Sequence, residues 1–174
     1  MQKIKVWDPL VRIFHWSLFS AFVANAIFVN EESQLHLWIG YGIVGLVLVR
    51  IVWGFVGTQY ARFSSFPPNL ADATDQMTEI ATGRKHIHRG HTPLGALMIY
   101  NLLAALLLIG VTGYMMTTNM FWGVEWVQEL HEVFVTWAEF SVVLHIAAVI
   151  FESRRTKVNL PRAMVTGYKE IPCE

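Results

Sequence analysis

"LHEVFVTWAEFSVVLH", residues 130–145, is a long apolar stretch with a histidine near each end, His131 and His145. The two histidines are fourteen residues apart. In an α-helix this spacing corresponds to roughly 21 Å of rise and almost four whole turns. The two imidazoles therefore lie on nearly one face of a helix, at two different depths. A segment of this kind predicts that a buried group is held between this helix and its neighbours.

The composition of the chain predicts a membrane protein. Of its 174 residues, 54% are hydrophobic and only 15% are charged, and the mean hydropathy is +0.42. A soluble domain of this size needs a more charged surface. Roughly 20 helical residues cross about 30 Å of hydrocarbon, and runs of this kind occur at about 11–29, 35–55, 93–114 and 127–151. We predict an all-α fold, a single integral-membrane four-helix bundle over residues 1–174.

Charge is distributed unevenly along the chain, which predicts its orientation. All thirteen Lys and Arg residues fall near the N-terminus, from the end of the second span through the loop at about 57–91, or in the C-terminal tail. The segments 30–34 and 115–126 carry none. By the positive-inside rule, both termini and the 57–91 loop are cytoplasmic.

The apolar outer faces of the four spans are expected to contact membrane lipid, and we expect no nucleic-acid partner. In the loop, residues 70–82 read as a helix ended by Gly83, and Thr92 as the N-cap of the third span.

The histidines in the spans sort into two levels. Three of the seven histidines lie in the loop, and the other four are His15, His36, His131 and His145. The predicted topology places His36 and His131 near the outer face, and His15 and His145 towards the cytoplasm. Haem iron takes axial histidines, and helical bundles hold such cofactors between facing helices. The pattern therefore predicts two haems, one ligated by His36 and His131 and the other by His15 and His145. A single buried histidine is often a hydrogen-bonded structural residue, but ionisable groups in membranes favour a functional role.

Other residues fit the same interpretation. Gly40, one turn after His36, and Ala138, midway between the histidines of the fourth span, leave room for a flat macrocycle. Arg50 is fourteen residues beyond His36, so it shares that helix face and is expected to contact a propionate of the cytoplasmic haem. The only cysteine is Cys173 and no C-x-x-C-H occurs, so the haems are expected to be non-covalent, b-type haems.

The chain resembles the bacterial cytochrome b561 family, and within it the b-type cytochrome subunits of membrane-bound nickel–iron hydrogenases and their stand-alone relatives. The resemblance covers nearly the whole chain: "VWDPLVRIFHW" (6–16), the histidine-bearing second span, "GHTPLGALM" (90–98), the two histidines of the fourth span and "LPRAMVTGYKEIP" (160–172). The family's axial ligands fall on His15, His36, His131 and His145. The resemblance implies a bacterial inner-membrane protein that transfers electrons between the quinone pool and a redox partner protein: a c-type cytochrome, a hydrogenase or a flavoprotein. A quinol would be its only chemical substrate, so its status as an enzyme stays open.

Several alternatives remain open at this point. One is a histidine-bearing metal or proton transporter, and another is a membrane anchor whose haem has no redox role. The loop histidines, His86, His88 and His91, form a weaker candidate for a transition-metal site. Glu139 is deep for a carboxylate, and we expect either Asn25 or Asn101 to satisfy it structurally, or Glu139 to take part in proton movement.

Overall fold

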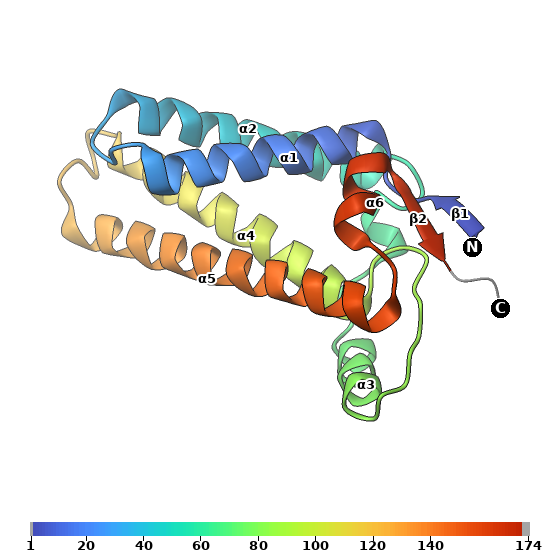
Figure 1. Cartoon of the computed structure of the whole chain (residues 1–174). Coiled ribbons are helices and arrows are strands. Elements are labelled where there is room, and N and C mark those ends of the chain that lie inside the picture. The colour runs from blue at the N-terminus through green and yellow to red at the C-terminus, as the bar shows by residue number, and fades with distance from the viewer. Residues whose placement is uncertain (1, 172–174) are drawn as a thin grey trace.

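The four apolar runs form four long helices that lie side by side (Figure 1). The computed structural model describes residues 2–171. The helices are α1 (Pro9–Val23, continued by a π-helical turn, Ala24–Phe28), α2 (Gln34–Val56), α4 (Pro93–Met116) and α5 (Glu125–Thr156). All four are long and apolar enough to cross a membrane. The prediction of four apolar helices is confirmed, and α5 extends past both predicted ends.

Side-chain caps begin three of the four helices where the sequence changes from polar to apolar. Ser33 accepts a hydrogen bond from the backbone N–H of His36, and Thr92 accepts one from Gly95, as its Thr-Pro sequence predicted. Asp8 caps α1 by accepting from the N–H of Val11. Burial acts to raise the pKa of Asp8, but hydrogen bonds, mainly from Thr58, outweigh it and leave that pKa below its usual value. The caps satisfy backbone donors that a helix start leaves unpaired.

Helix α4 is central in the bundle because it packs against both α2 and α5 (Figure 1). The α2–α4 contact is built on Ile43 and Val47 from α2, and on Leu103 and Leu106 from α4. At one point the two helices approach especially closely: a Cβ added to Gly110 would lie 2.3 Å from Val44 Cγ2. Most large apolar side chains on the outer faces of the four helices remain exposed, as expected of a surface in contact with lipid.

The loop between α2 and α4 contains a short helix, α3 (Leu70–Ala81). Its N-cap is Asn69, and Gly83 follows it in the left-handed region with a φ of 73°. The predicted helix at 70–82 is therefore confirmed. The buried side chain of Gln76 accepts a hydrogen bond of 2.9 Å from the N–H of Leu94, which joins α3 to the start of α4.

The two ends of the chain meet in a small sheet that the all-α prediction did not include. Strand β1 (Gln2–Lys5) pairs antiparallel with β2 (Tyr168–Ile171), and a short helix, α6 (Leu160–Thr166), precedes β2. The carbonyl of Gly167 accepts hydrogen bonds from the N–H groups of Val6 and Trp7. We call β1, α6 and β2 the terminal cap; with α1 it encloses a small core of its own, Val6, Trp7, Val11, Ala61 and Ala163. Cys173 lies outside the described residues.

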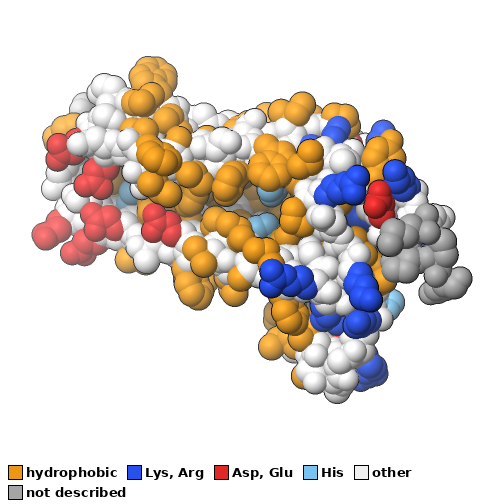
Figure 2. Space-filling view, viewed as in Figure 1, with side chains coloured by type: hydrophobic (Ala, Val, Ile, Leu, Met, Phe, Trp, Pro, Cys, Tyr) orange, Lys and Arg blue, Asp and Glu red, His pale blue; other side chains and the backbone are white. Residues whose placement is uncertain are grey.

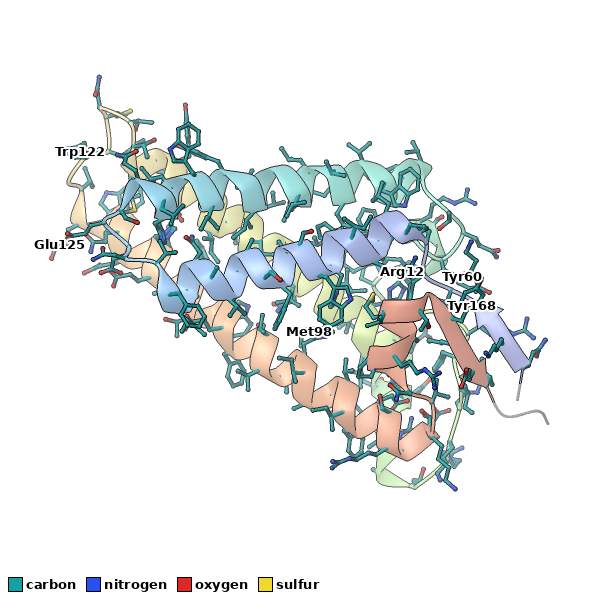
Figure 3. The ribbon with its side chains drawn as sticks, turned by 45° about the horizontal axis from the view of Figure 1, so that its top comes forward. Arg12, Tyr60, Met98, Trp122, Glu125 and Tyr168 are labelled. Atoms are coloured by element: carbon teal, nitrogen blue, oxygen red, sulfur yellow. The ribbon has the colours of Figure 1, made fainter. Side chains whose placement is uncertain are left out.

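The two ends of the bundle carry opposite charge. Figure 2 shows acidic side chains gathered at the end away from the terminal cap and basic side chains around the cap. Figure 3 places Trp122 and Glu125 at the first end, and Arg12, Tyr60 and Tyr168 at the second. The exposed glutamates of the acidic end come from the loop before α2 and from the start of α5: Glu31, Glu32, Glu125, Glu129 and Glu132.

Candidate functional site

The histidines of α1 and α5 face each other. The ring centres of His15 and His145 are 6.4 Å apart, and their planes are inclined by 54°. A metal ion bound by two imidazoles on opposite sides, with bonds of about 2 Å, places the ring centres roughly 6 Å apart. The separation of these two rings therefore suits one metal ion held between α1 and α5.

The other two histidines lie one level further along α5. His36 on α2 is close enough to His131 on α5 to interact with it electrostatically. His131 Nδ1 also lies 2.9 Å from Thr112 Oγ1, a hydroxyl on α4. The structure therefore brings together the histidines that the sequence predicts to lie at the same depth: His15 with His145, and His36 with His131.

Several buried polar atoms at these two levels have no partner within residues 2–171. They are His15 Nδ1, His36 Nδ1, Asn25 Oδ1 and Arg50 Nη1. Leaving such an atom unpaired costs about 1–3 kcal/mol, more when the group is charged. A cofactor that carries both a metal ion and carboxylates fits this donor set, because the imidazoles would bind the metal and the guanidinium would pair with a carboxylate.

Arg50 is the strongest indication that this region can bind an anion. Its side chain is only 4% exposed, and its guanidinium carbon lies 5.1 Å from the centre of the Phe63 ring. The ionisable groups that act on it are Asp8 and Tyr100, and neither forms a salt bridge with it. A buried guanidinium requires hydrogen-bonding partners, and the carboxylates of a haem are of the right chemistry.

Gly40 and Ala138, the two small residues singled out in the sequence, have different surroundings. A Cβ added to Gly40, one turn after His36, would meet no atom within 4 Å. Ala138, between the two histidines of α5, is fully buried. Small side chains therefore stand at both positions where the sequence predicted room for a macrocycle.

The loop histidines do not form one cluster. The rings of His86 and His88 are 4.4 Å apart, but His91 lies between the rings of Phe66 and Trp7, at 4.1 and 4.6 Å. Burial lowers the pKa of His91 to about 3, assisted by the charges of Lys169 and Arg50. Across residues 2–171, no group of three or more His, Cys, Asp or Glu side chains is placed to hold a metal ion.

Asn101 does not pair with Glu139, as one of the expectations for Glu139 required. The Asn101 amide donates to Ser141 Oγ at 2.9 Å, and its carbonyl accepts from Trp137 Nε1 at 2.9 Å. Asn25 Oδ1 is buried and unpaired, and Glu139 is exposed on α5. Asn101 is used instead to join α4 to α5, and the proton-movement hypothesis for Glu139 stays a prediction.

Sequence reasoning missed two polar residues at these sites. Thr112 lies nineteen residues before His131 on a different helix. Lys169 is 4% exposed, and its Nζ donates to the carbonyls of His88 and Gly90. In both cases the contact depends on how two elements rotate against each other, which the local sequence does not reveal.

One comparison with known proteins gave a match. The model of a family described as prokaryotic cytochrome b561 matches residues 6–167. No curated protein and no solved structure matches the chain.

Proposed function

This chain belongs to the prokaryotic cytochrome b561 family, and from that premise we propose that it transfers electrons between the quinone pool and a redox partner protein through two b-type haems. Membership implies haem-mediated electron transfer across a membrane, with b-type haem as the cofactor. The four candidate spans make the chain a multi-pass membrane protein. The number of haems, their ligands and the partners are the proposal.

The observation that carries the proposal is the pair of facing imidazoles of His15 and His145, at 6.4 Å. We assign these two side chains to the inner haem, and His36 and His131 to the outer one. Arg50, buried with an unpaired nitrogen, would donate to a propionate of the inner haem. A charge-assisted bond of this kind is about twice as strong as a neutral one.

Bound haem supplies one-electron redox chemistry. The four histidines would hold the iron, and Arg50 would pair with a propionate. We place both termini and the 57–91 loop in the cytoplasm of a bacterial inner-membrane protein that forms one domain. A quinone site is proposed near the inner haem, lined by part of α1 and the loop before His91. The redox partner is proposed to be a c-type cytochrome, a hydrogenase or a flavoprotein.

Haem content and four single substitutions test the proposal. The purified protein should bind two haems per chain, and acidified organic solvent should extract both. His36→Ala and His131→Ala should each remove one spectral component, and His15→Ala and His145→Ala should each remove the other. Only variants that still insert into the membrane are compared. If His131→Ala and His145→Ala deplete the same component, the two-level assignment is wrong.

Reduction by quinol separates electron transfer from the remaining alternatives. A transporter of metal ions or protons would show no reduced-minus-oxidised haem spectrum. An anchor whose haem only supports the fold would be red but would not be reduced by a quinol or by any of the three partner classes. The proposal requires reduction by quinol or by one of these partners.

A further inference from the structure

A buried hydroxyl group lies beside one of the four histidines in the spans. Thr112 on α4 is 3% exposed, and its Oγ1 is 2.9 Å from Nδ1 of His131 on α5. The next residue, Gly113, leaves little room beside the ring: a Cβ added there would lie 3.2 Å from His131 Cε1. Two successive residues of α4 therefore fix the position of this imidazole.

The neighbours of the Thr112 hydroxyl determine the direction of its hydrogen bonds. Its Oγ1 lies 2.8 Å from the carbonyl of Leu108 and 3.1 Å from that of Ile109. A carbonyl only accepts, and a hydroxyl has a single proton to donate. The proton of Thr112 is therefore directed to the carbonyls of its own helix, and Oγ1 is left to accept. In this arrangement the donor to Oγ1 is Nδ1 of His131, which requires the tautomer that carries its proton on that nitrogen.

This arrangement selects one tautomer of His131. A neutral imidazole with its proton on Nδ1 has its free electron pair on Nε2. Nε2 is then the atom available to a metal ion. The Nδ1 atoms of His15 and His36, in contrast, are buried without a partner within residues 2–171. His131 therefore differs from its partner His36 and from His15 in having its second nitrogen satisfied.

We propose that Thr112 is a positioning residue that fixes the tautomer and ring plane of His131 and thereby lowers the midpoint potential of the outer haem. This inference rests on the proposed function, because it requires His131 to be an axial ligand. An acceptor on Nδ1 makes the opposite nitrogen more basic. A more basic ligand favours ferric over ferrous iron, so it lowers the potential of the haem it binds and leaves the other haem unaffected.

Two substitutions at Thr112 separate the hydroxyl from the volume of the side chain. Thr112→Val keeps the branched shape and removes the acceptor, whereas Thr112→Ser keeps the acceptor and removes a methyl group. Outer-shell partners of metal ligands typically change affinity by about 10–100-fold. A tenfold shift in the preference for ferric iron corresponds to about 59 mV for one electron. We expect Thr112→Val to raise the outer potential by about this amount and Thr112→Ser to restore it.

The control is Thr136→Val, which makes the same change at an exposed position of α5. Membranes containing each variant are titrated redox-potentiometrically, and the low-spin ferric EPR signals of the two haems are recorded. Thr112→Val should also alter the EPR signal of the outer haem, because its axial ring is free to rotate. Thr136→Val should change neither measurement. If Thr112→Val does not accumulate, Thr112→Ala removes the same acceptor and is measured in its place.

The outcomes distinguish this inference from the proposed function. If His131→Ala removes no haem component, the ligand assignment fails and this inference fails with it. If His131→Ala removes the outer component but Thr112→Val leaves its potential and EPR signal unchanged, only the role of Thr112 is refuted. Equal shifts in both haems, or no recovery in Thr112→Ser, also refute it, because they indicate general loosening of the bundle.

Discussion

Gly110→Ala should separate α2 from α4 and destabilise the bundle. The added Cβ would lie 2.3 Å from Val44 Cγ2, whereas carbon atoms in contact are separated by about 3.5–4.0 Å. Val44 has little freedom to turn away, because a valine in a helix strongly prefers a single rotamer. The helices therefore have to move apart locally by more than about 1 Å.

The expected cost follows from two opposing effects. Overpacking a well-packed contact costs about 1–3 kcal/mol. Replacing glycine by alanine inside a helix returns about 1 kcal/mol, because alanine is the better helix former. We expect a net loss of up to about 2 kcal/mol. Gly45→Ala is the matched control on α2, because a Cβ at Gly45 meets no atom within 4 Å and should be neutral or stabilising.

A double-mutant cycle with Val44→Ala tests the cause. Each variant is unfolded in mixed micelles with increasing denaturing detergent, and helix content is followed by circular dichroism. Val44→Ala alone loses some packing, but it removes Cγ2, the atom that the added Cβ of Gly110→Ala would overlap. The double variant should therefore be more stable than the sum of the two single changes predicts, by about 1 kcal/mol or more. Additive effects would refute the contact as the cause.

Three other substitutions give sharp expectations. Arg50→Gln should lower the midpoint potential of the inner haem and leave the outer one nearly unchanged in a redox titration, because a nearby cation favours the reduced state. Gly40→Ala should reduce outer-haem content without loss of helix content, because a Cβ there meets no protein atom within 4 Å but would enter the space proposed for the outer haem. Burial lowers the pKa of Lys169 to about 8 from 10.5, so the folded protein releases this proton before the unfolded chain does. The free energy of unfolding of the protein should therefore rise between about pH 8 and 10.5, by up to about 3 kcal/mol. Lys169→Met should abolish this rise. An unchanged pH profile in that variant would count against the burial of the charge.

The sequence predicted the elements whose signals are local. Apolar length revealed the four spans, and the Thr92-Pro93 pair and Gly83 marked helix boundaries that the structure confirms. The histidines could be paired because depth follows from topology and helix rise alone. This reasoning needs no knowledge of how the helices are rotated.

Features that depend on rotation or on distant pairing could not be predicted. Helix α4 is apolar all round, so its sequence does not show which face meets α5, and the contact of Thr112 with His131 stayed hidden. The hydrogen bonds of Asn101 to α5, in place of the expected contact with Glu139, stayed hidden for the same reason. Strand β1 is four residues long and mostly polar, and its partner lies at the other end of the chain. Nothing local marks such a pair.

The pairing of β1 with β2 also has a consequence for biosynthesis. Gln2 precedes all four spans along the chain, and its partner Ile171 follows all four. At about 5–20 residues per second, the ribosome has already produced all four spans when β2 is made. The terminal cap therefore closes only after all four spans have been made, over the end of the bundle that contains Arg50 and His91. Until then β2 is not available to cover this end, so the order of synthesis leaves the end accessible to a cofactor before the terminal cap is complete.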